Sequence, residues 1–194
     1  MDLSFEKQYN GSIIAGVDEA GRGPLAGPVV AAAVIIDQSN IIAGINDSKK
    51  LSISKRKSLY EEITSNYIWS VDIVPPEEID RIGILQSTIK ACFGAVADLS
   101  LRADIILVDG NMKFADSRFR SIIKGDSKSI SIAAASIVAK VTRDRIMKDL
   151  ALEYPHYGWE KNVGYGTKMH IQAMIEHGLT KYHRKSFKIK NMDY

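Results

Sequence analysis

The sequence has one cysteine, few prolines and no long hydrophobic run. Because Cys92 is the only cysteine among 194 residues, the chain can form no internal disulfide. Such usage is typical of proteins in a reducing cytoplasm, which is the location we predict. No run of about 18 apolar residues occurs, and no basic and then apolar leader opens the chain. We therefore expect neither a membrane span nor a signal peptide.

Length and charge limit the remaining classes. A chain of 194 residues with 45% hydrophobic and 25% charged residues can bury one core, so we expect a single domain over 1–194. Its polar first stretch, about 1–11, is expected to be flexible. The net charge of +3 and the pI near 8.8 allow a polyanionic partner without requiring one.

The most informative stretch runs from Val17 to Pro28. Its acids, Asp18 and Glu19, end an apolar run that begins at Ile13. A loop follows, with glycines at 21, 23 and 27 and prolines at 24 and 28, which is too rich in both to be helix interior. Carboxylates at a strand end, beside exposed backbone amides, suit a hard metal ion and a phosphate. A solvated turn is the simpler explanation for such a pair.

The loop partly matches two nucleotide-binding motifs but satisfies neither. The stretch from Gly21 to Ala26 matches the G-x-G-x-x-A pattern of dinucleotide sites, but that motif needs a helix opening at the glycines. Residues 29–36 instead form a second strand-like apolar run. A phosphate-binding Walker loop fails because Arg22 and Gly23 stand where Lys and Ser or Thr are required.

Hydrophobic periodicity predicts an α/β fold. The first two apolar runs are almost continuous, which predicts strands buried on both faces and helices covering the sheet. Ser54 is the expected N-cap of the first long helix. The predicted strands cover 13–18, 28–37, 67–74, 103–108 and 119–124, and the predicted helices cover 54–65, 84–99, 130–152 and 167–177. A short helical turn is expected near 77–80, and an aromatic, glycine-rich loop over 154–166.

Acidic residues follow three of the predicted strands. Asp18, Asp109 and Asp126 each come after a strand and before glycine or a polar turn, so a shared sheet edge would bring them together. With Glu19 they make four carboxylates that would repel each other unless cations lay between them. Oxygen ligands without a His or Cys cluster favour Mg²⁺ or Mn²⁺ over zinc. Such a set suits two-metal phosphoryl transfer.

Five sequence blocks, in order over residues 13–187, resemble ribonuclease HII, the type 2 ribonuclease H family. They are Asp18–Pro28, Asp47–Leu51, Val108–Asn111, Lys124–Lys128 with Ser131–Asp144, and Gly164–His170. The resemblance implies a ribonuclease H-like fold, a mixed five-stranded sheet flanked by helices, with extra carboxyl-terminal helices over 153–194 that help to cover the substrate. It places the catalytic and metal-binding acids on Asp18, Glu19, Asp109 and Asp126.

The resemblance also implies a substrate and the residues that contact it. The family hydrolyses the RNA strand of RNA/DNA hybrids and cuts 5′ to single ribonucleotides in duplex DNA, leaving 3′-hydroxyl and 5′-phosphate ends. The backbone of Gly21, Arg22 and Gly23 is expected to contact the 2′-hydroxyl, Tyr165 to stack on the sugar, and Lys49 to lie near the phosphate. Taken alone, Tyr165 is more typical of a packing residue and Lys49 of a solvated one.

The basic tail gives a separate argument for a nucleic-acid partner. Five fixed positive charges fall within residues 181–190, and each phosphate that they neutralise would release counterions. Among them we expect Arg184 and Lys185 to bind phosphates, although a basic end can also be simply solvated. His170, His177 and His183 lack the spacing of a zinc site, and we interpret them as structural or phosphate-contacting.

The predicted partners are RNA/DNA hybrid and ribonucleotide-containing duplex DNA. No obligate protein partner or sliding-clamp peptide is evident, and we expect a monomer. Three alternatives remain at this point. Another nuclease on the same kind of sheet would share the acids without selecting ribose, an inactive nucleic-acid-binding module would bind without cutting, and a dinucleotide-dependent enzyme is the most remote.

Overall fold

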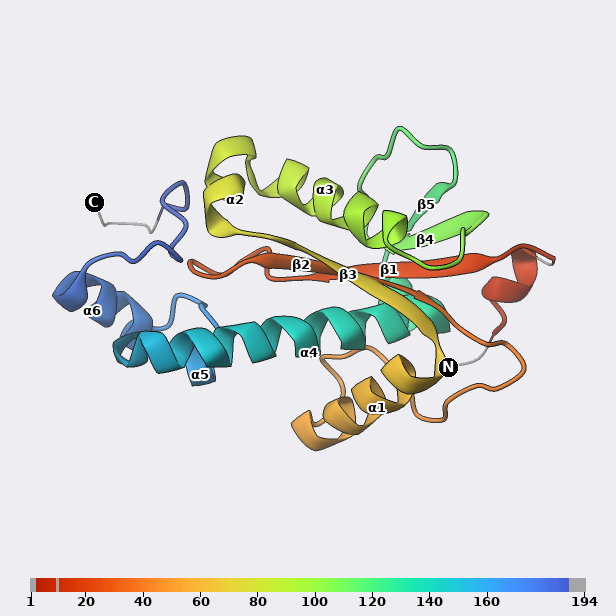
Figure 1. Cartoon of the computed structure of the whole chain (residues 1–194), viewed down its shortest axis with the longest axis horizontal. Helices are drawn as coiled ribbons and strands as arrows, with labels where there is room; N and C mark the ends of the chain where they lie inside the picture. Colours follow the sequence, from red (N-terminus) through yellow and green to blue (C-terminus); the bar gives the residue numbers. More distant parts are fainter. Residues whose placement is uncertain (1–2, 10, 189–194) are drawn as a thin grey trace.

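The centre of the molecule is a five-stranded mixed sheet. Figure 1 presents the computed structural model, which describes residues 3–9 and 11–188. The strand order is β3-β2-β1-β4-β5; β2 pairs antiparallel with β1 and β3, whereas β4 runs parallel to β1 and β5. This confirms the predicted mixed sheet. The strands are β1 (Ile14–Ala20), β2 (Val29–Ile35), β3 (Ile68–Val74), β4 (Ile105–Asp109) and β5 (Phe119–Ile122).

Helices cover both faces of the sheet, as the apolar runs predict. Helices α1 (Ile53–Asn66) and α4 (Ile130–Glu153) lie on one face, and α2 (Pro76–Ile82) and α3 (Ile84–Ala97) lie on the other (Figure 1). Most of β1 and β2 is therefore fully buried. Within the described residues, no helix combines the length and apolar character needed to cross a membrane.

The long helix α4 begins in direct backbone contact with β1. Its first half is buried against the sheet, as its small apolar residues predict. At Gly16 in β1, an added Cβ would lie only 2.1 Å from the carbonyl carbon of Ser131. Glycine at position 16 therefore permits an approach that no other residue would allow.

A group of short helices packs against the far end of α4. These are the 3₁₀ helix η3 (Pro155–Tyr157), α5 (Trp159–Asn162) and α6 (Lys168–His177). Their shared core contains Met147, Ala151, Trp159, Ala173 and Met174. The prediction of a plain loop over 154–166 is wrong, because Tyr157 and Trp159 are large enough to anchor two short helices in this core.

The start of the chain contains a short helix that the sequence analysis did not predict. Within the described residues, the 3₁₀ helix η1 (Glu6–Tyr9) lies in the stretch, about 1–11, that was expected to be flexible; residues 1, 2 and 10 lie outside the described part. The buried carboxylate of Glu6 accepts hydrogen bonds from the Ser129 hydroxyl at 2.6 Å and from the Ser131 amide at 3.0 Å. Glu6 thus caps the amino end of α4, where a negative charge is favourable.

The start of α1 differs slightly from the prediction. The helix begins at Ile53, and the Ser52 hydroxyl, rather than that of Ser54, accepts a hydrogen bond from the Lys55 amide at 3.2 Å. Both serines satisfy the N-cap preference, so residue type alone could not choose between them. The N-cap of α6 is Thr167, which the prediction over 167–177 had as the first residue of the helix.

Candidate active site

Three of the predicted acids meet at one sheet edge. Asp18, Asp109 and Asp126 each place a carboxylate oxygen within 4.8 Å of the others. The parallel strands β1 and β4 carry the first two, and the 3₁₀ helix η2 (Gly125–Ser127), which follows β5, carries the third. Asp18 lies inside β1 rather than after it, because pairing with β2 continues to Ala20. Together these three form the acid cluster.

Backbone amides hold these carboxylates in place. The Oδ1 atom of Asp109 accepts from the Gly125 amide at 2.7 Å and from the Asp126 amide at 3.4 Å. Asp18 Oδ1 accepts from the Glu19 amide at 2.7 Å. The strand end and the turn of η2 therefore fix the cluster before any ligand binds.

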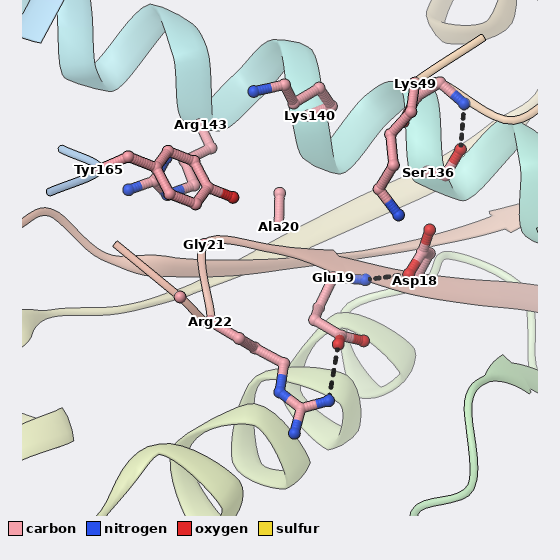
Figure 2. Close-up of a pocket in the computed structure, with 12 residues that line it drawn as sticks. Asp18, Glu19, Ala20, Gly21, Arg22, Lys49, Ser136, Lys140, Arg143 and Tyr165 are labelled. Atoms are coloured by element: carbon pink, nitrogen blue, oxygen red, sulfur yellow. Dashed lines mark hydrogen bonds and ion pairs between the residues drawn. The ribbon is translucent and has the colours of Figure 1, made fainter. Parts of the chain in front are cut away.

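Glu19 lies beside the cluster and not within it. Successive strand residues point to opposite faces, and Figure 2 shows the Glu19 side chain directed away from that of Asp18. Arg22 donates to Glu19 Oε1 at 3.3 Å, while Glu19 Oε2 is buried without a hydrogen-bond partner among the described residues. The two-residue period of a strand could have predicted this separation from the sequence.

Burial and mutual repulsion make the acids difficult to ionise. Burial raises the pKa of Asp18 well above its usual value, and the charges of Glu19 and Asp109 raise it further. Burial and the charge of Asp109 also raise the pKa of Asp126. The Lys49 ammonium reaches to 4.0 Å from Asp126 but is largely exposed, and in Figure 2 it points toward Asp18.

The chemistry of this donor set fits a hard divalent cation. Three carboxylate oxygens converge, one further buried carboxylate oxygen of Glu19 has no partner among the described residues, and burial disfavours the negative charge of Asp18, Glu19 and Asp126. Mg²⁺ and Mn²⁺ bind such oxygen sites and would remove the repulsion.

A hollow of about 340 Å³ opens beside the acids. Its walls include Gly21, Arg22, Gly23 and Tyr165, together with Asp18, Glu19 and Lys49. Tyr165 is 47% exposed, and a Cβ at Gly23 would lie 3.6 Å from its ring. The structure thus brings the predicted sugar-contacting residues to one hollow. Figure 2 shows Tyr165 on the α4 side of β1 and the Arg22 side chain on the opposite side.

Sequence reasoning missed five residues that line this hollow, one of which is Ala20 at the end of β1. Ser136, Lys140 and Arg143 all come from α4, and Ser48 precedes Lys49. The helical residues are spaced at i, i+4 and i+7, which puts them on one face of the helix. That spacing was a usable signal in the sequence.

The structure contradicts the expected role of Arg184. Its side chain is only 2% exposed, and its guanidinium donates to backbone carbonyls of the glycine loop, so it is not available to grip a phosphate. A basic residue near a chain end is usually solvated, and nothing local signals the burial. Lys181, Lys185 and Lys188 are exposed, and the contact of Lys185 with phosphate stays a prediction. Lys190 lies outside the described residues.

His170 and His183 are buried and structural. Their Nε2 atoms lie 3.1 Å apart, and Trp159 donates to His170 Nε2 at 3.0 Å. His183 Nδ1 accepts from the Thr180 amide, and His170 Nδ1 lies 2.9 Å from the Tyr165 carbonyl. This pattern assigns a proton to Nε2 of His183 and to Nδ1 of His170, with both rings neutral. The chain of bonds ends on the backbone of Tyr165.

Comparison with known proteins agrees with this geometry. The family model described as "Ribonuclease HII" matches residues 15–190. The ribonuclease HII of Rickettsia canadensis is 66% identical over 186 residues, which cover 96% of this chain and 95% of the relative.

Solved structures extend the likeness to the fold. The ribonuclease H2 of Pyrococcus horikoshii superposes with a TM-score of 0.77 at 28% identity, covering 90% of this chain and 93% of the other. The ribonuclease HII of Archaeoglobus fulgidus, solved as a complex with PCNA, gives 0.75 at 29% identity, covering 93% and 98%. The fold is therefore ribonuclease H-like. The chain belongs to the ribonuclease HII family, and it is accordingly a nuclease of the ribonuclease H type.

Proposed function

We propose that this enzyme hydrolyses the RNA strand of RNA/DNA hybrids and also cuts on the 5′ side of single ribonucleotides in duplex DNA, leaving 3′-hydroxyl and 5′-phosphate ends. The observation that supports it best is the acid cluster beside the hollow lined by Gly21, Arg22, Gly23 and Tyr165. The acid cluster suits phosphodiester hydrolysis, and the lining of the hollow suits selection of a ribose.

Asp18, Asp109 and Asp126 would hold divalent cations, with Glu19 contributing from the opposite face of β1. Bound cations of this kind supply an activated water and stabilise the leaving oxygen, which is the two-metal chemistry that we propose. Magnesium and manganese both fit an all-oxygen set, so we propose either as the cofactor.

The protein itself positions the reacting groups. The Glu19 amide holds the Asp18 carboxylate, and the Gly125 amide orients that of Asp109. Lys49, reaching between Asp18 and Asp126, has a pKa that burial lowers and those carboxylates raise, with a net increase. It therefore stays positively charged, and we propose that it contacts the phosphate at the cut site.

Selection of ribose requires contact with its 2′-hydroxyl, the group that distinguishes RNA from DNA at a single position. We propose that the backbone of the loop Gly21–Gly23 and the exposed Tyr165 ring make that contact. Glycine at position 23 leaves the Tyr165 ring at van der Waals distance, so a sugar can reach the loop backbone. Lys185 is proposed as a phosphate contact on the outer part of the duplex.

The proposed partners are RNA/DNA hybrid and ribonucleotide-containing duplex DNA, bound by a monomer. A cytoplasmic location stays a prediction from cysteine usage. The Archaeoglobus relative forms a complex with PCNA, but no clamp-binding peptide is evident in this sequence. We therefore propose no sliding-clamp partner.

A DNA duplex with one ribonucleotide, end-labelled and incubated with Mg²⁺ or Mn²⁺, tests the function on a sizing gel. We expect one cut, 5′ to the ribose. Asp109→Asn should abolish cutting while duplex binding persists, and Asp116→Asn, just before β5 and outside the cluster, should leave cutting intact. Comparable cleavage of all-DNA duplex would favour a nuclease without ribose selectivity. No cutting with Mn²⁺ would favour an inactive binding module.

A further inference from the structure

Arg184 makes an unusual set of contacts beneath the glycine loop. Its Nε and Nη2 atoms donate to the Gly27 carbonyl at 2.9 and 2.8 Å, Nη2 also donates to the Gly21 carbonyl at 2.5 Å, and Nη1 donates to the Arg22 carbonyl at 3.1 Å. These partners lie about 160 residues away in the sequence. One buried side chain thus holds three carbonyls of the loop that carries the proposed ribose contact.

These bonds also fix the direction of two backbone donors. In a trans peptide the C=O and N–H groups point in opposite directions. The carbonyls of Gly21 and Arg22 belong to the same peptide units as the amides of Arg22 and Gly23. Because Arg184 draws both carbonyls inward, those two amides point away from it. Among the described residues, neither amide donates to a protein acceptor, and both residues line the hollow.

We propose that Arg184 is a positioning residue for ribose selection, which aims the Arg22 and Gly23 amides at the 2′-hydroxyl of the substrate. The proposal rests on the proposed function, because it assumes that this loop meets the sugar. It replaces a phosphate-gripping role for Arg184 with one exerted entirely through the loop backbone.

Arginine suits this task better than lysine. Its planar guanidinium presents five donors in a fixed fork, so it can hold carbonyls in a set orientation, whereas lysine offers one rotatable point charge. The segment that follows is fastened to α2: Asp80 accepts from the Lys185 and Ser186 amides, both at 2.9 Å, and from the Ser186 hydroxyl at 2.6 Å. The loop is therefore ordered before the substrate arrives, which reduces the entropy lost on binding.

The test measures binding in the non-cleaving Asp109→Asn background, with Mg²⁺. Dissociation constants are determined by fluorescence anisotropy for two duplexes that differ only in one 2′-hydroxyl. We expect Arg184→Lys to lower the preference for the ribonucleotide duplex about tenfold, or ~1.4 kcal/mol, while affinity for the all-DNA duplex changes less than about twofold. Arg118→Lys is the matched control, because Arg118 is half-buried and also donates to a carbonyl, that of Ala103. It should leave both constants unchanged.

Each other outcome has a distinct meaning. A preserved preference in Arg184→Lys would overturn the proposal, and so would equal weakening of both duplexes, which is the signature of a phosphate contact. If the Asp109→Asn protein with Arg184 intact showed no preference for the ribonucleotide duplex, the result would instead contradict the proposed function itself.

A second variant keeps the test decisive if Arg184→Lys does not fold, as judged by circular dichroism. Asp80→Asn loosens the segment at Lys185 and Ser186 while keeping the guanidinium. We expect it to lower the ribose preference about threefold, by the same physical route with a smaller displacement. An unchanged preference in that folded variant would equally refute the role of Arg184.

Discussion

Two regions of this molecule bury ionisable groups, and they treat them in opposite ways. In the acid cluster, carboxylates face one another with few compensating donors, and burial together with repulsion raises the pKa of Asp18 and Asp126. In the basic support beneath the glycine loop, formed by Arg143, His170, His183 and Arg184, the buried donors have acceptors.

Arg143 illustrates the satisfied region. Its three nitrogens donate to the carbonyls of Pro28, Val163 and Ala26 at 2.9 to 3.1 Å. Burial lowers its pKa to about 10, which still leaves the side chain charged at neutral pH. The comparison teaches that buried carboxylates without compensating positive charge indicate a ligand site. A buried guanidinium whose donors all have acceptors instead indicates a structural role.

The largest expected effect would come from removing one carboxylate of the acid cluster. Asp126→Asn should reduce cleavage of the single-ribonucleotide duplex at least about a thousandfold, or about 4 kcal/mol in the barrier. It should not lower the stability of the metal-free protein, because it removes one of several mutually repelling charges. Single-turnover cleavage and urea unfolding in EDTA measure the two effects. Substantial destabilisation would mean that the acids are structural, contrary to the comparison.

A smaller effect should follow from adding the cation. Since a ligand that binds only the folded state stabilises it, Mg²⁺ or Mn²⁺ at about a hundred times its dissociation constant should add about 2.7 kcal/mol. Thermal melting with and without EDTA measures this gain. Asp109→Asn should lose most of it, whereas Asp116→Asn should keep it. Equal gains in both variants would place the cation outside the acid cluster.

The smallest effect concerns acid and the histidines. Burial and the neighbouring His170 lower the pKa of His183 from 6.5 to about 4, so the unfolded chain binds a proton more readily between those values. Stability contributed by neutral His183 is thus complete above the unfolded pKa and falls as the pH drops toward the folded one.

Urea unfolding from about pH 7 to about pH 4 measures this slope. His183→Gln should flatten it relative to the starting protein, whereas the exposed His156, changed to Gln, should not. Tyr157, Trp159 and Thr180 are the other groups that contact the His183 ring, and none gains a charge in this range. An unchanged slope in His183→Gln would show that the buried pair does not govern the acid response.

The sequence predicted most of the fold because its signals were local. Continuous apolar runs marked β1 and β2, and small residues marked the buried half of α4. The approach of Asp18, Asp109 and Asp126 was predicted from strand ends, since parallel strands finish at a common edge. The strand period could also have separated Glu19 from the others, and that signal was overlooked.

What the sequence could not supply was contact between distant polar groups. Glu6 accepts hydrogen bonds at the start of α4 from residues 123 and 125 positions away in the sequence. Arg184 donates hydrogen bonds to carbonyls about 160 positions away. Neither pairing leaves a periodic trace, because backbone amides and carbonyls exist at nearly every residue. Glu6 was therefore included in a polar stretch expected to be flexible, and Arg184 was expected to bind a phosphate.

The close contact between β1 and α4 at Gly16 also affects the spacing of the acid cluster. Asp18 follows Gly16 by two residues on β1, and Asp126 precedes Ser131 by five residues. The distance between β1 and α4 at this contact therefore influences how far apart the two carboxylates lie. One methyl group there would act as a spacer that lifts the helix from the sheet and widens the gap between the acids. The spacing of the acid cluster thus depends on glycine at position 16, whose side chain is a single hydrogen atom.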